Sequence, residues 1–139
     1  MDVKMAIKTA QLRLEGGPEV EAALRELGGK IARNLGRNAA RAGARVVVNS
    51  AKAKTPVRTG ELRDSIRMFD ERFEQGANRT AYAGSRLFYA YWVEFGTART
   101  PARSFLRAAK DESADAVREK MSDNLANGIE REMAKYRGR

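Results

Sequence analysis

The sequence contains no cysteine and no histidine. Without cysteine there can be no disulfide, no thiolate zinc site and no cysteine nucleophile. Without histidine the chain lacks the commonest general base and the commonest transition-metal ligand. The 18 acidic residues are scattered and form no recognisable catalytic motif. We therefore expect a protein that is not an enzyme and that needs no metal and no other cofactor. A metal-dependent hydrolase using Asp64 or Glu94 is the least favoured alternative, because neither has a partner at ligand spacing.

Long apolar runs are also missing, since none approaches the roughly 20 residues needed to span a bilayer. The first residues alternate charged and apolar side chains and lack the apolar centre of a signal peptide. We therefore expect no membrane contact and synthesis in the cytoplasm. The 139 residues, with 42% hydrophobic and 32% charged side chains and only 3 prolines, indicate a single helix-rich domain over residues 1–139.

Positive charge is plentiful, with a formal net charge of +9 and a pI of about 10.2. Residues 30–58 contain eight basic residues and no acidic ones. Four arginines recur every fourth residue and form a stripe, called here the basic stripe: Arg33, Arg37, Arg41 and Arg45. Such a stripe is either a solvated face or a surface for a nucleic-acid backbone or an acidic neighbour. Repulsion at this spacing predicts a nearby counter-charge.

The N-terminal half reads as a strand followed by a long amphipathic helix. Charged and apolar residues alternate over residues 2–8, which is typical of an edge strand or an extended arm within residues 1–17. After Pro18, apolar residues recur at helical spacing to about Ala53, either as one long helix or as a short and a long one separated at Gly28 and Gly29. The helix is thin at Gly36, Ala40 and Gly43, where another backbone could approach closely.

The remaining pattern predicts a structured loop, a hairpin and a second helix. Residues 55–66 combine Pro56 and Gly60 with one or two helical turns after the glycine. Residues 65–73 and 78–86 fit antiparallel strands around a turn near residues 75–76. From Pro101 the pattern is helical, with residues 130–139 expected to fray. The predicted fold is α+β, with a long amphipathic helix and a C-terminal helix packed on a small antiparallel sheet.

An aromatic segment over residues 89–108 contains the only tryptophan. Its rings predict core, interface or both. Glu94 stands between apolar neighbours, so its burial requires hydrogen-bond donors or a cation, and we expect a nearby arginine. Gly96 permits the turn that ends the segment.

Two motifs in order resemble the small tail components of long-tailed phages typified by gene product ten of phage HK 97. The first motif consists of Pro56, Thr59, Gly60, Leu62, Ser65 and Ile66. The second consists of Tyr89, Ala90, Val93, Glu94, Phe95, Gly96, Thr97, Pro101, Ala102, Arg103, Phe105, Leu106, Arg107 and Ala109. Ser104 departs from the pattern, because the family often has a proline there.

The resemblance implies a non-enzymatic virion protein at the neck or in the tail that builds a ring as a head-tail joining or tail-completion protein. Its implied partners are further copies of itself, the connector and tail-tube proteins, and packaged DNA. The basic stripe would face the DNA path or an acidic neighbouring ring. Subunit contacts are expected from a set of motif residues together with the tryptophan: Pro56, Thr59, Gly60, Leu62, Tyr89, Trp92, Glu94, Phe95, Gly96, Arg103 and Phe105. A tail terminator is the close alternative, and a sequence-independent DNA-binding protein is the alternative of another class.

Overall fold

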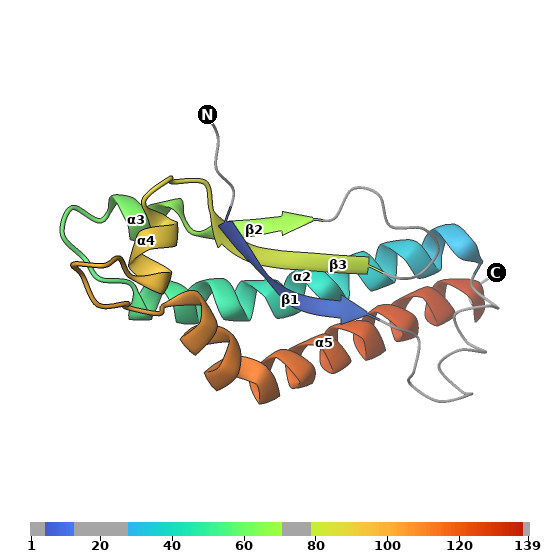
Figure 1. Cartoon of the computed structure of the whole chain (residues 1–139). Coiled ribbons are helices and arrows are strands. Elements are labelled where there is room, and N and C mark those ends of the chain that lie inside the picture. The colour runs from blue at the N-terminus through green and yellow to red at the C-terminus, as the bar shows by residue number, and fades with distance from the viewer. Residues whose placement is uncertain (1–4, 13–27, 71–78, 138–139) are drawn as a thin grey trace.

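Two long helices lie side by side and run in opposite directions (Figure 1). They are α2 (Gly29–Lys54) and α5 (Leu106–Arg137), shown as cyan-green and orange-red ribbons in this computed structural model. The structure describes residues 5–12, 28–70 and 79–137. The expected long helix is confirmed from Gly29 onward, whereas residues 18–27 lie outside the described residues.

The ends of α2 follow from backbone chemistry. Gly28 precedes the helix with a φ of 89°, a value that favours glycine. At the other end, Thr55 adopts an extended conformation because the ring of Pro56 disfavours helical geometry in the preceding residue. The Thr55 hydroxyl donates to the carbonyl oxygen of Ala51 at 2.6 Å, which satisfies an acceptor left free by the helix end.

A three-stranded antiparallel sheet covers a face of α2, with strand order β1-β3-β2. The strands are β1 (Met5–Leu12), β2 (Arg67–Asp70) and β3 (Arg79–Ser85). β1 shifts register between Lys8 and Ala10. The hairpin of β2 and β3 confirms the predicted antiparallel pair, and its turn lies outside the described residues.

Small side chains bring these layers together. Ala40 and Ala44 of α2 pack against Ala81 of β3. On the α5 side, a Cβ added to Gly43 would lie 2.8 Å from Cγ of Met121, so only glycine fits there without a shift. The thin part of α2 is therefore covered by β3 and α5 of the same chain. The close approach predicted for that helix is made within the monomer.

The main core lies where α2 ends, beside two short helices, α3 (Glu61–Ser65) and α4 (Ala90–Phe95). Gly60 begins α3 from a left-handed conformation with a φ of 84°. Val47, Ile66, Phe105 and Leu106 are among the largest fully buried side chains of the described residues.

The α+β prediction is confirmed, with α2 carrying the sheet. The C-terminal helix packs mainly along α2 and reaches the sheet at β1. Its described part continues to Arg137, and the fraying expected for residues 130–139 stays a prediction.

Candidate assembly surface

Helix α4 carries most of the aromatic segment and turns its rings outward. Phe88, just before the helix, packs edge-on against Trp92 with ring centroids 5.7 Å apart. Tyr91 and Phe95 form a second pair at 4.8 Å. All four residues are well exposed: Phe88 by 60%, Tyr91 by 52%, Trp92 by 50% and Phe95 by 45%. Trp92 and Phe95 are therefore not core residues, and an interface at these two positions stays a prediction.

The buried positions of α4 are Ala90 and Glu94. Glu94 is 0% exposed and accepts hydrogen bonds from the backbone N–H groups of Phe105, Leu106 and Arg107 at 2.8, 2.9 and 2.9 Å. Phe105 directly precedes α5, and Leu106 and Arg107 begin it, so the donors lie where free N–H groups and the helix dipole favour a negative charge. The carboxylate thus joins α4 to the start of α5.

Arg107 supplies the cation that the sequence predicted for Glu94. Its Nε donates to Glu94 Oε1 at 3.0 Å, and its Nη2 donates to the Glu94 carbonyl oxygen at 3.0 Å and to Ser104 Oγ at 2.7 Å. The guanidinium carbon also lies 4.4 Å from the centroid of the Phe95 ring, within cation–π range. Ser104, the departure from the family pattern, takes part in this network.

Gly96 allows the chain to turn back after α4. Its φ is 78°, and an added Cβ would lie 2.7 Å from the backbone nitrogen of Ala102 and 2.9 Å from the carbonyl oxygen of Thr100. The N–H of Thr97 donates to the carbonyl oxygen of Thr100 at 2.9 Å, which closes a short loop. The backbone N–H of Arg103 then donates to the carbonyl oxygen of Val93 at 2.8 Å, so the returning chain lies along α4.

A groove of about 520 Å³ lies between the segments that carry the first and the second motif. Residues of both segments line it: Pro56, Arg58, Thr59, Gly60, Glu61, Leu62, Tyr89 and Val93. The hydroxyl of Tyr89 donates to Glu61 Oε2 at 3.1 Å across the groove. Partial burial and this hydrogen bond together raise the pKa of Tyr89 above its ordinary value.

The basic stripe is interrupted by an internal ion pair. Arg41 binds both carboxylate oxygens of Asp70 on β2, with Nε 3.2 and 3.0 Å from Oδ1 and Oδ2. The hydrogen bond to Asp70 is the main reason why the pKa of Arg41 is raised. Asp70 is the counter-charge that the spacing predicted. Arg33, Arg37 and Arg45 are exposed.

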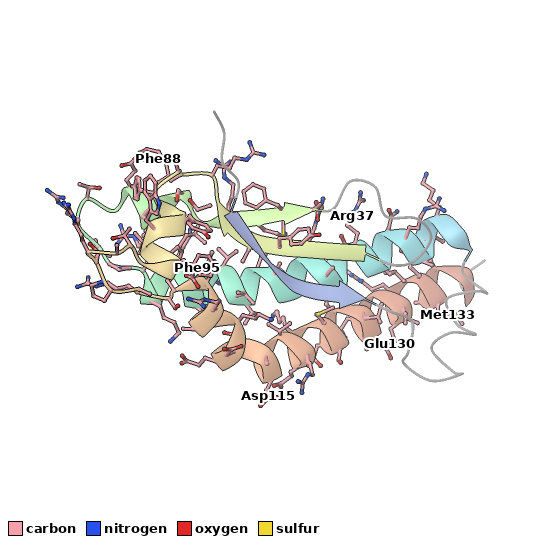
Figure 2. All side chains as sticks on the ribbon, in the orientation of Figure 1. Arg37, Phe88, Phe95, Asp115, Glu130 and Met133 are labelled. Atoms are coloured by element: carbon pink, nitrogen blue, oxygen red, sulfur yellow. The ribbon has the colours of Figure 1, made fainter. Side chains whose placement is uncertain are left out.

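The structure therefore brings residues of the two motifs together at one groove. The basic stripe takes no part in that groove. Pro56, Thr59, Gly60, Leu62 and Tyr89 share the groove. Glu94, Gly96 and Phe105 are internal supports, whereas Trp92, Phe95 and Arg103 are exposed. Arg37 and Phe88 lie toward opposite ends of the molecule (Figure 2).

Sequence reasoning missed three exposed residues at this end: Val57, Phe88 and Arg99. The position of Phe88, four residues before Trp92, was the signal that could have grouped it with the exposed ring of Trp92. Val57 and Arg99 lie in loops and follow no periodic pattern.

Among the described residues, no three or more acidic side chains gather closely enough to hold a metal ion. Nor does this part of the chain contain a helix sufficiently long and apolar to cross a membrane.

Comparison with known proteins confirms the family to which the sequence bears a resemblance. The family described as "Bacteriophage HK97-gp10, putative tail-component" matches residues 19–96, which is more than half of the chain. The match includes the whole first motif and α4, and it ends at Gly96. No curated protein and no solved structure matches the chain. The chain belongs to the HK97-gp10-like family of bacteriophage tail components.

Proposed function

We propose that the protein is a structural component of the phage neck, where it forms a ring around the DNA path as a head-tail joining or tail-completion protein. It works by fitting against copies of itself and against connector and tail-tube proteins, and it makes or breaks no bond. Membership in a family of tail components supports a place in the virion.

The observation that carries the proposal is the aromatic face of α4, made of Phe88, Tyr91, Trp92 and Phe95. Each side chain is exposed by 45% or more. A soluble monomer rarely exposes several large rings together, and aromatic residues are enriched at protein interfaces. Glu94 and Arg107 hold the helix in place beneath these rings. A rigid apolar surface of this kind fits a subunit contact.

The basic stripe supplies the second surface of the proposal. Arg33, Arg37 and Arg45 are exposed on α2, and Figure 2 shows Arg37 toward the opposite end of the molecule from Phe88. In a ring they would line the DNA path or meet an acidic neighbouring ring. Arg41 contributes less to the positive charge of this surface, because Asp70 neutralises it.

The decisive experiment is to image virions produced without the protein. Tails of normal length that fail to attach to heads indicate a joining role. Tails of uncontrolled length indicate the alternative, a tail terminator that caps the tail tube. Purified infectious particles that lack the protein, formed at the normal rate, would overturn both roles.

A sequence-independent DNA-binding protein is the candidate of another class, favoured by the three exposed arginines of the stripe. Binding through phosphates releases counterions, so the affinity would fall steeply with salt. A salt titration with duplex DNA tests this directly. Tight, salt-sensitive binding by an isolated monomer favours this candidate, whereas weak binding together with ring formation favours the neck protein.

A further inference from the structure

The aromatic face lies at an end of the molecule that also carries positive charge. Arg58 lines the groove beside α4, and Arg99 and Arg103 are exposed in the loop that follows the helix. Val57, in the loop that supplies Arg58, is 60% exposed. We call Val57, Arg58, Phe88, Tyr91, Trp92, Phe95, Arg99 and Arg103 the aromatic end. An apolar centre with a charged rim is the usual make-up of a specific protein interface.

Helix α5 carries a surface of opposite sign. Asp111, Asp115, Glu119 and Asp123 follow one another at four-residue intervals, and all four are exposed. They extend over about 18 Å at 1.5 Å per residue. Figure 2 shows Asp115 on the side of α5 that faces away from the sheet. We call these four residues the acidic face.

Exposed basic residues of the same helix, Lys110, Arg118 and Lys120, neutralise the acidic face only through solvent-exposed contacts. Asp115 has an ion pair with Arg118, but the two side chains are 98% and 77% exposed, so the pair is weak. Like charges at four-residue spacing also repel one another along a helix. A cationic partner would relieve this repulsion.

We infer that the aromatic end of one copy docks on the acidic face of a second copy. This inference rests on the proposed ring and names the two surfaces that would form its subunit contact. Chains with a net charge of +9 repel one another, and a contact that places opposite charges together offsets this repulsion. The acidic face offers that contact, and the exposed rings supply apolar area beside the arginines.

The geometry of such a contact favours closure. The two surfaces are different, so each copy can donate one and accept with the other. A head-to-tail contact of this type produces a ring when the rotation between copies closes and a filament when it does not. Each subunit would then have both surfaces covered, which leaves none of the large rings of α4 facing water.

The test uses two variants of the full chain, each with one damaged surface. Trp92→Ser with Arg99→Ser damages the aromatic end, and Asp115→Lys with Glu119→Lys damages the acidic face. Each variant alone should associate at least about tenfold more weakly than the wild type, as measured by native mass spectrometry and light scattering. Mixed in equal amounts, the variants should form a one-to-one dimer that grows no further, because each retains one intact surface.

Two matched single variants show whether the position of a charge change on α5, and not the change in net charge, weakens association. Glu119→Lys and Glu130→Lys make the same change at exposed positions of the same helix. The first should weaken association and the second should leave it near the wild-type value. Circular dichroism checks that all variants keep the wild-type helix content.

Two outcomes distinguish this inference from the proposed function. If Asp115→Lys with Glu119→Lys forms rings of wild-type mass, the docking is overturned while the ring stands. If the wild type stays monomeric at every concentration and in the presence of tail tubes and connectors, the ring itself is overturned. If damage to the aromatic end leaves the ring intact and abolishes DNA binding, this end is a nucleic-acid surface and the docking is overturned.

Discussion

At the scale of single residues, Glu94 is the position on which the second motif depends. Its carboxylate accepts three backbone N–H donors from the start of α5 and one from Arg107. The need for an arginine could be predicted, because a carboxylate among apolar neighbours requires compensation. The three backbone donors could not, because they depend on how closely the chain returns to α4 after Gly96.

Replacing Glu94 with glutamine should destabilise the fold strongly. The amide has one acceptor oxygen, and its NH₂ group would face N–H donors that need an acceptor. We expect a loss of about 2–4 kcal/mol in the free energy of unfolding, measured in urea. The control is Glu119→Gln, which removes an exposed carboxylate of α5 and should change stability by less than about 0.5 kcal/mol. Equal losses from the two variants would contradict the capping role of Glu94.

Gly96 permits a second prediction with a closely matched control. Gly28 and Gly96 have similar backbone angles, with φ of 89° and 78° and ψ of 158° and 175°. An added Cβ meets nothing within 4 Å at Gly28, but it lies 2.7 Å from the Ala102 nitrogen at Gly96. Gly28→Ala should therefore cost about 1–3 kcal/mol from backbone strain alone. Gly96→Ala should cost about 1–3 kcal/mol more, because the loop must also shift.

Urea unfolding of the two alanine variants gives the free energy of unfolding of each. The difference between the two values measures the cost of the close Cβ contact at Gly96, because the backbone strain is similar at both positions. If Gly96→Ala were no more damaging than Gly28→Ala, the loop after α4 would be free to move. It would then not hold the aromatic rings in a fixed position, and the rigid surface proposed for assembly would lose its support.

At the scale of elements, the existence and type of most segments could be predicted from periodicity. Apolar residues at helical spacing gave the long helix, and alternating residues gave the strands. The packing of these elements could not be predicted in the same way. Gly43 marks a close approach, but only the fold shows that Met121 of α5 fills the space. The rings of α4 illustrate the same difficulty, because an aromatic cluster fits a core and an interface equally well.

The contact between α3 and α4 predicts a dependence on pH. The pKa of Tyr89 is raised from 10.0, first by partial burial and then by its hydrogen bond to Glu61. A raised pKa means that the folded state favours the protonated phenol. Its stabilising contribution is therefore complete below pH 10.0 and is lost as the pH rises through the folded value.

Thermal unfolding between pH 9 and pH 11 tests this dependence, and each measurement is compared with the wild type. Tyr89→Phe should lose less stability over this interval than the wild type, because the titrating hydroxyl is gone. Tyr91→Phe, which removes an exposed hydroxyl from α4, serves as the control. A loss in Tyr89→Phe as large as that of the wild type would show that the hydroxyl does not couple to folding.

At the scale of the whole molecule, the proposed function assigns different contacts to the aromatic end and to the basic stripe. The aromatic end is apolar and lies beside the groove formed by the two family motifs. The basic stripe lies on α2, and its Arg37 lies toward the opposite end of the molecule from Phe88 (Figure 2). The sequence predicted the basic stripe and part of the aromatic end, but it did not indicate Val57, Phe88 and Arg99. It could not separate the positions of the two surfaces, because the distance between Arg37 and α4 depends on the way in which α2 crosses the whole molecule.

The basic stripe gives the last prediction. Replacing Arg33, Arg37 and Arg45 with glutamine removes three positive charges from exposed positions, so the free energy of unfolding should change by less than about 0.5 kcal/mol per site. Arg41 is kept, since its loss would leave Asp70 without its partner. Infectivity should fall sharply, because a lumen or a neighbouring ring would lose its electrostatic complement.

The matched control removes the same charge from other surfaces. Arg67, Arg86 and Lys135 are exposed outside the basic stripe, the aromatic end and the acidic face, and their replacement with glutamine lowers the net charge equally. If this control reduces infectivity as much as the stripe variant, net charge alone is responsible. If the stripe variant is as infectious as the wild type, the stripe faces solvent and takes no part in assembly or DNA passage. Loss of infectivity in the stripe variant alone, with normal folding, requires that the stripe meets an anionic partner in the particle, because a charge that faces only solvent would be replaceable at either position.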